Sequence, residues 1–79
     1  MEDRTLNLCE ERCPMALLRA KRFCAHMQDG ERASILVTDK QSLHDMVRYF
    51  QAHSFSVQLE ECDLISTLTV QKERQSPHV

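Results

Sequence analysis

Hydrophobic and polar residues follow two different periods along the 79-residue chain, and together these predict six regular elements. A period of two is typical of strands, whereas apolar residues three or four positions apart are typical of helices. A strand–helix–strand unit implies a parallel strand pair with a right-handed crossover, and a closing hairpin is antiparallel. The pattern predicts an α/β fold of the α+β two-layer sandwich kind, β-α-β-α-β-β, with two helices on one face of a mixed four-stranded sheet. We expect the strands at residues 5–8, 33–38, 55–59 and 64–70, and the helices at residues 15–27 and from about 39–42 to about 53–54.

The chain is short enough to form one domain with one modest core. In the first helix, the stripe Leu17, Ala20, Cys24 and Met27 is expected to be buried. Gly30 is expected to end this segment in the left-handed conformation. We predict a turn at residues 60–63, and a single domain over residues 1–79 whose polar residues 72–79 form a frayed tail.

Charge and composition narrow the function classes. The net charge of −2 provides no basic field for direct nucleic-acid binding. No apolar run approaches the roughly 20 residues of a membrane span, and the N-terminal residues do not resemble a signal peptide. We therefore expect a cytoplasmic protein without a membrane partner, whose four cysteines are free thiols rather than a disulfide framework.

Cys13 is the strongest candidate for chemistry, because Pro14 follows it and a helix follows Pro14. Proline is favoured in the first turn of a helix. The first amides of a helix lack partners and favour an anion, so a cysteine at the N-cap is expected to have a lowered pKa and a stabilised thiolate. Arg12 adds a positive charge beside it, whereas Glu10 and Glu11 oppose this effect. The alternative is that Cys13 has only a structural role, as a small capping residue.

The segment around Cys13 resembles the signature of the TusA family, also called SirA-like, which runs roughly Leu-Asp-x-x-Gly-Leu-x-Cys-Pro-x-Pro. The chain departs from it at Asn7, Glu10, Glu11 and Ala16, and keeps Cys13-Pro14. The resemblance covers nearly the whole chain, and the family fold agrees with the element order predicted above. The residues that carry it are Leu6-Asn7-Leu8-Cys9-Glu10-Glu11-Arg12-Cys13-Pro14-Met15-Ala16, Met27-Gln28-Asp29-Gly30-Glu31, Ile35-Leu36-Val37-Thr38-Asp39 and Asp45-Met46.

The resemblance implies a sulfur carrier rather than a stand-alone enzyme, with no cofactor and no metal. Such a carrier accepts sulfane sulfur as a persulfide on Cys13 from a cysteine desulfurase or rhodanese-like donor. It then passes the sulfur to an acceptor thiol protein, for example in tRNA thiolation, molybdenum-cofactor synthesis or sulfur oxidation. Arg12 and Pro14 would support the helix start. The expected partner surface comprises Met15, Leu18, Arg19, Arg22 and Asp45; the alternative is that Arg19 and Arg22 form an ordinary solvated helix face.

Other hypotheses remain open from the sequence. The chain could be a regulatory or scaffold module that kept the fold and lost sulfur transfer. Cys9 could act as a resolving thiol for Cys13, or both could bind zinc together with a histidine or Cys62. An RNA-binding domain of related fold is disfavoured by the acidic balance and the few aromatic residues.

Overall fold

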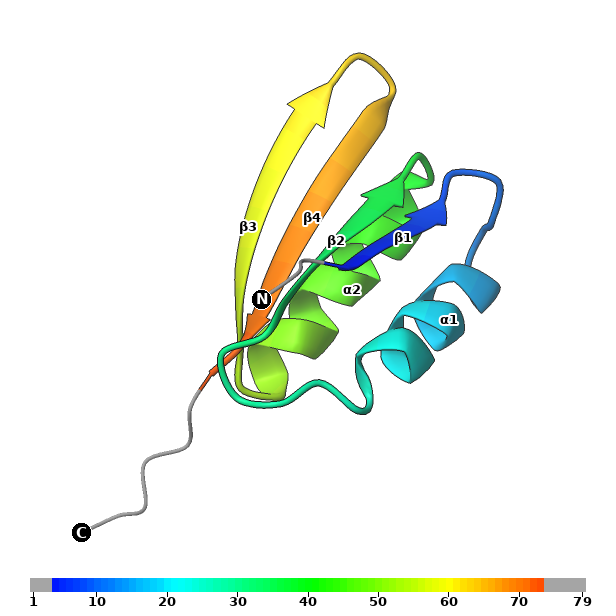
Figure 1. Cartoon of the computed structure of the whole chain (residues 1–79). Coiled ribbons are helices and arrows are strands. Elements are labelled where there is room, and N and C mark those ends of the chain that lie inside the picture. The colour runs from blue at the N-terminus through cyan, green and yellow to red at the C-terminus, as the bar shows by residue number, and fades with distance from the viewer. Residues whose placement is uncertain (1–3, 74–79) are drawn as a thin grey trace, which may run out of the picture.

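The computed structural model describes residues 4–73, and its elements follow the predicted order (Figure 1). The predicted two-layer fold is confirmed: both helices pack on one side of a mixed four-stranded sheet. No helix in the described part of the chain is long and apolar enough to cross a membrane. The elements are β1 (Arg4–Leu8), α1 (Met15–Cys24), β2 (Arg32–Val37), α2 (Lys40–Ala52), β3 (Phe55–Cys62) and β4 (Ile65–Lys72).

The sheet has the strand order β1-β2-β4-β3, and the two central strands, β2 and β4, carry more buried residues than the edge strands. β1 and β2 are parallel, as the strand–helix–strand unit predicts, and β4 is antiparallel to both β2 and β3. In β2 every second residue is buried, and Ile35 lies opposite the fully buried Leu68 of β4. Phe50 and Met46 of α2 complete this core from the helical layer.

α2 begins where the sequence predicts, because Asp39 caps it. The Asp39 carboxylate accepts hydrogen bonds from the backbone N–H of Ser42 at 3.0 Å and from the Ser42 hydroxyl at 2.5 Å. A carboxylate in this position pairs an otherwise orphaned amide and interacts favourably with the helix dipole. The cap therefore fixes the end of α2 that lies nearest to Cys13.

α1 is shorter than predicted, since it ends at Cys24 and not at Met27. Beyond that point the Ala25 N–H donates to the Arg22 carbonyl and the Met27 N–H donates to the Cys24 carbonyl, both three residues back. These tighter turns end the α-helical pattern while Met27 stays buried. Gly30 has φ +87°, which confirms the left-handed turn.

The buried stripe of α1 also differs by one position from the prediction. Ala16, Ala20 and Cys24 are buried, whereas Leu17 and Phe23 are only partly buried against the same core. The stripe follows the spacing of four residues along the helix, as it does in an α-helix that packs against a sheet.

The C-terminal hairpin is longer than predicted. Glu60, Glu61 and Cys62 continue β3 and pair with Thr67, Ser66 and Ile65, so the predicted turn at residues 60–63 is wrong. Lys72 is also ordered, because it pairs with Phe55 and its N–H donates to the Glu31 carbonyl at 2.9 Å. The predicted frayed tail is therefore wrong at Lys72, and residues 74–79 lie outside the described part of the chain.

Candidate functional site

Cys13 lies in the loop that joins β1 to α1, and its side chain is exposed. The helical hydrogen bonds begin at Arg12, whose carbonyl accepts from the Ala16 N–H at 2.9 Å. Pro14, after a cis peptide bond, is the N-cap residue, and no side chain caps the helix. The prediction that Cys13 itself is the N-cap is therefore wrong by one residue, although Cys13 does lie at the start of the helix.

α2 supplies two carboxylates to Cys13. The Cys13 Sγ–H donates to Asp45 Oδ2 at 3.6 Å, and the Cys13 backbone N–H donates to Asp39 Oδ2 at 3.4 Å. The other oxygen of Asp45 accepts a hydrogen bond from Gln41 Nε2 at 3.2 Å, which fixes the direction of the carboxylate. The loop of Cys13 is thus held against α2 by both its backbone and its side chain.

These carboxylates determine the electrostatics of the thiol. Partial desolvation, the hydrogen bond to Asp45, and the negative charges of Asp45 and Asp39 all raise the pKa of Cys13 above its ordinary value. The prediction of a lowered pKa is therefore wrong: desolvation and the carboxylates of Asp45 and Asp39 raise the pKa of Cys13, and Arg12 is not among the groups that shift it. Glu10 and Glu11, to which the sequence pointed, are not the groups responsible.

The pKa of Asp39 is shifted in the opposite direction. The hydrogen bonds from the Ser42 hydroxyl and the Ser42 N–H lower it, and the Cys13 N–H and the charge of Arg12 add to this effect against some desolvation. Asp39 is therefore an ionised anchor shared by the cap of α2 and the backbone of Cys13. Sequence analysis identified it only as a capping candidate, because its contact with Cys13 spans 26 positions.

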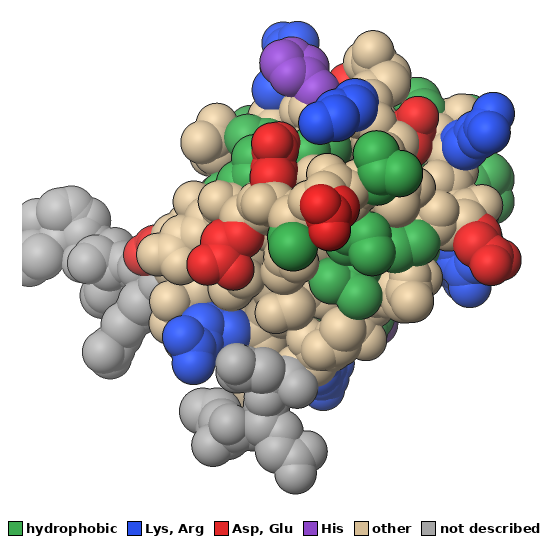
Figure 2. All heavy atoms as spheres, turned by 90° about the horizontal axis from the view of Figure 1, so that it is seen from above, with side chains coloured by type: hydrophobic (Ala, Val, Ile, Leu, Met, Phe, Trp, Pro, Cys, Tyr) green, Lys and Arg blue, Asp and Glu red, His purple; other side chains and the backbone are tan. Residues whose placement is uncertain are grey.

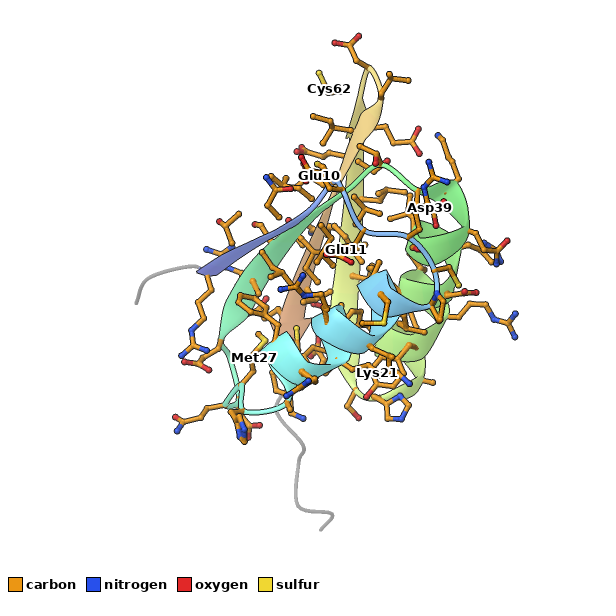
Figure 3. The ribbon with its side chains drawn as sticks, turned by 90° about the vertical axis from the view of Figure 1, so that its right-hand side faces the viewer. Glu10, Glu11, Lys21, Met27, Asp39 and Cys62 are labelled. Carbon is orange, nitrogen blue, oxygen red and sulfur yellow. The ribbon has the colours of Figure 1, made fainter. Side chains whose placement is uncertain are left out.

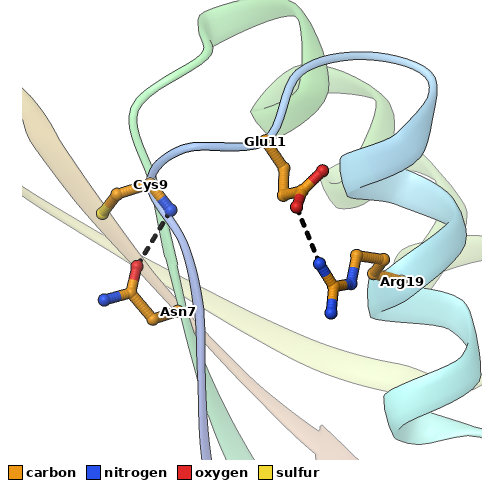
Figure 4. Close-up of polar contacts among 4 residues, drawn as sticks. All are labelled: Asn7, Cys9, Glu11 and Arg19. Atoms are coloured by element: carbon orange, nitrogen blue, oxygen red, sulfur yellow. Dashed lines mark hydrogen bonds and ion pairs between the residues drawn. The ribbon is translucent and has the colours of Figure 1, made fainter.

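The remaining predicted surface residues lie along α1, with Met15 and Leu18 in its first half and Arg22 in its last turn. Met15 and Leu18 are exposed, with 51% and 47% of their area accessible, and Arg22 is exposed as well. Arg19 is not a free basic group, because its Nη1 lies 2.7 Å from Glu11 Oε2 in an ion pair (Figure 4). The predicted basic row on α1 is therefore partly neutralised by the loop that leads to Cys13.

A small polar hollow of about 270 Å³ adjoins this loop. Three of its six lining residues, Glu10, Glu11 and Asp39, are acidic, and Arg12 is basic. Figure 3 shows Glu10 and Asp39 toward the end of the molecule that carries Cys62 and Glu11 near the middle, with Lys21 and Met27 at the opposite end. The complete lining is Cys9, Glu10, Glu11, Arg12, Thr38 and Asp39.

The other cysteines differ in their surroundings, and all four are free thiols. Cys24 is buried in the core as predicted, and desolvation raises its pKa to about 11, with an opposing effect from Arg4. Cys9 is partly buried; its N–H donates to Asn7 Oδ1 and its carbonyl accepts from Thr38 Oγ1. Cys62 is exposed at the end of β3. Among residues 4–73, no three His, Cys, Asp or Glu side chains are grouped so that they could hold a metal ion.

Comparison with known proteins assigns the class. The family described as "Sulfurtransferase TusA" matches residues 4–72. Two proteins of Neisseria meningitidis, from strains of serogroups A and B, are each 33% identical over 72 residues; the match covers 90% of this chain and 97% of theirs. Their names are "Putative sulfur carrier protein NMA0882" and "Putative sulfur carrier protein NMB0681". The chain belongs to the TusA sulfurtransferase family. The family and the names of these relatives support a sulfur-carrier role.

Solved structures support the same fold. The SirA-like protein of Desulfitobacterium hafniense superposes with a TM-score of 0.80 at 19% identity, covering 92% of this chain and all of that one. HP1264 of Helicobacter pylori gives a TM-score of 0.69 at 13% identity, covering 90% of this chain and 99% of that one. The fold is therefore that of the SirA-like proteins.

Proposed function

We propose that the protein carries sulfane sulfur as a persulfide on Cys13, accepting it from a protein donor and passing it to an acceptor thiol. The observation that carries this proposal is the geometry of the Cys13-Pro14 motif: the thiol is exposed, while two contacts with α2 fix its loop. A persulfide must be reached by the thiolate of another protein, so exposure is essential. Cys24 does not meet this requirement, because it is buried.

Each transfer is an exchange at sulfur without net oxidation. The Cys13 thiol loses its proton to a base or to the departing donor thiolate, and its Sγ attacks the outer sulfur of the donor persulfide. The new Sγ–S bond forms as the donor S–S bond breaks, so a donor thiol and a Cys13 persulfide result. In the second step an acceptor thiolate attacks the outer sulfur, and Cys13 leaves as a thiolate.

Neighbouring residues would have distinct roles in this scheme. Pro14 and Arg12 would shape the start of α1, and Asp45 would orient the resting thiol. The donor would be a cysteine desulfurase or a rhodanese-like protein, and the acceptor a thiol protein of tRNA thiolation or sulfur metabolism. The proposal places the chain in the cytoplasm as a single domain. The one sheet and one core shared by all six elements support the single domain.

Intact-mass analysis tests the proposal. The protein is incubated with a cysteine desulfurase and cysteine in one arm, with a rhodanese and thiosulfate in a second, and with inorganic polysulfide in a third. We expect a gain of one sulfur atom that a reductant removes and that Cys13→Ser abolishes. Cys62→Ser is the matched control, because Cys62 is the other fully exposed thiol, and it should load as the wild type does.

The absence of any sulfur gain in all three arms would reject the carrier, as would loading by the desulfurase or the rhodanese that survives Cys13→Ser. The raised pKa of Cys13 favours a second function, a regulatory or scaffold module of the same fold. For that module Cys13→Ser should leave partner binding intact, and sulfur loading should be absent in the wild type.

A further inference from the structure

The β3–β4 hairpin carries an apolar tip that nothing in the described part of the chain covers. Leu64 in the turn is 82% accessible, and the neighbouring Ile65 at the start of β4 is 42% accessible. Leu59, 44% accessible, lies further back on β3 and on the opposite face, because it pairs with the buried Leu68 whereas Ile65 pairs with Cys62. Figure 2 looks onto this end of the molecule, where hydrophobic side chains gather among acidic ones. Large apolar side chains grouped at a projecting point are typical of contact surfaces for other proteins.

Side-chain contacts connect the hairpin to Cys13. Glu61 Oε2 lies 3.9 Å from Lys40 Nζ, and Lys40 follows Asp39, which accepts the hydrogen bond from the Cys13 N–H. Leu64 is three residues beyond Glu61, which corresponds to about 10 Å at roughly 3.4 Å per residue. The strands of the hairpin extend past the other two strands on the same side as the loop of Cys13 (Figure 1). A protein that reaches Cys13 from solvent therefore approaches alongside the hairpin.

The same end of the molecule has a strongly unbalanced charge. Seven acidic residues lie on the hairpin, in the loop of Cys13 and on or just before α2, against the basic residues Arg12, Arg19 and Lys40, and the last two are already paired with Glu11 and Glu61. Three of the acidic residues are exposed on the hairpin itself. The seven are Glu10, Glu11, Asp39, Asp45, Glu60, Glu61 and Asp63.

We propose that the tip of the β3–β4 hairpin, formed by Leu64 and Ile65, docks into an apolar cleft with a basic rim on the sulfur-donating protein. The inference rests on the proposed function, because the docked protein is the one that exchanges sulfur with Cys13. Apolar contact at the tip supplies the buried centre of the interface, and the acidic residues around it match a basic rim.

The basic row on α1 is a weaker alternative for the same partner. Arg19 already pairs with Glu11 at 2.7 Å, so an acidic partner would have to compete with a carboxylate of this chain. Arg22 alone then remains of that row. Charge complementarity therefore favours a basic partner at the hairpin over an acidic partner at α1.

A basic rim would also assist the chemistry at Cys13. Asp45 and Asp39 disfavour a thiolate in the free protein. Positive charges brought close by the partner would offset these carboxylates, because opposite charges within about 4–6 Å favour an ionised thiol. The thiol would then become reactive when the correct partner has docked.

The test compares two ways of loading Cys13. Persulfide transfer is timed below saturation with the protein donor that loads the wild type, and separately with inorganic polysulfide, which needs no docking. Leu64→Ser and Glu60→Lys should each slow loading by the protein donor about tenfold. They should leave polysulfide loading within about twofold of the wild type, because neither residue contacts Cys13. Added salt should slow the wild type more than Glu60→Lys.

Matched variants complete the design. Leu64→Met keeps the apolar area and Glu73→Lys reverses a charge at the opposite end, so both should load as the wild type does. Unchanged transfer in Leu64→Ser and Glu60→Lys would overturn the inference, as would slowing by Arg22→Gln in their place. Loss of self-association in Leu64→Ser without slower transfer would assign the tip to a second copy and also overturn it. Failure of polysulfide to load the wild type would instead contradict the carrier proposal itself.

Discussion

The Cys13 Sγ–H donates a hydrogen bond to Asp45 Oδ2 at 3.6 Å, which joins the loop before α1 to α2. Gln41 holds the second oxygen of Asp45, so the carboxylate is directed at the sulfur. Asp45 is among the groups that raise the pKa of Cys13. The resting thiol is therefore kept neutral by a carboxylate from a different element of the fold.

Asp45→Asn should make Cys13 more reactive. The substitution removes a negative charge and keeps a side chain of the same shape, so the pKa of Cys13 should fall. For a fall of about one unit, alkylation at pH 7 should become about threefold faster, since the gain in thiolate is partly offset by its weaker nucleophilicity. Timed alkylation with iodoacetamide in a Cys9→Ser, Cys62→Ser background measures this, and Asp29→Asn at the opposite end is the control. A slower or unchanged rate in Asp45→Asn would contradict the assignment.

Asp39→Ala should destabilise the protein and release the Cys13 loop. The variant loses the cap of α2 and the acceptor of the Cys13 N–H in one step. We expect Tm to fall by about 5 °C, and amide exchange at Cys13 to become faster. Asp39→Asn retains a capping oxygen, so its Tm should fall much less than that of Asp39→Ala. Equal Tm values for Asp39→Ala and the wild type would show that this cap contributes nothing.

The same residue predicts a pH dependence of stability. The pKa of Asp39 is lowered in the folded protein, so its contribution is fully present above the unfolded value of about 3.9 and is lost as pH falls through the folded value. Asp39→Asn has no carboxylate to protonate. Urea unfolding from pH 7 to pH 3 should therefore show the wild type losing stability relative to Asp39→Asn at the acidic end. A difference in the free energy of unfolding that stays constant with pH would contradict the lowered pKa of Asp39.

The features of the site that the sequence predicts are the local ones. Cys13-Pro14 at a helix start, the cap at Asp39 and the left-handed Gly30 each depend on neighbours within a few positions, so composition and spacing suffice. The charge balance at Cys13 is different. It depends on Asp39 and Asp45, which are 26 and 32 positions away and reach the thiol only when α2 packs beside the loop. The sequence therefore predicted the position of Cys13 at the start of α1, but it predicted the wrong direction for the pKa of this thiol.

The end of α1 and the turn between β3 and β4 were predicted wrongly for the same reason: long-range contacts decide them. Residues 25–27 favour a helix locally, yet the chain tightens after Cys24 so that Met27 can reach the core. Glu60, Glu61 and Cys62 resemble a turn, but β4 continues opposite them and its backbone groups pair with theirs. In both segments, contacts with distant parts of the chain override the conformation that the local sequence favours.

Gly30→Ala should reduce stability although no atom lies within 4 Å of the added Cβ. Its cost arises from the backbone, because φ is +87° and a residue with a Cβ is strained in that region. We expect a loss of about 1 kcal/mol in the free energy of unfolding. Gly30→Asn should lose less, since asparagine tolerates the left-handed conformation better than alanine. Urea unfolding measures both variants, and a stabilised Gly30→Ala protein would refute the explanation.

Cys24 should behave as a core residue and not as a reactive thiol. It is 5% accessible and has a pKa of about 11, so a maleimide should label Cys13 and Cys62 in the native protein and reach Cys24 only on unfolding. Cys24→Ser places a hydroxyl in the apolar core and should cost about 1–3 kcal/mol, whereas Cys24→Ala should cost about 1 kcal/mol. Peptide mass mapping after timed labelling gives the order of reaction, and urea unfolding gives the two energies. Labelling of Cys24 as fast as Cys62 in the native state would mean that the core opens around α1, and the rigid support we assign to Cys13 would then be lost.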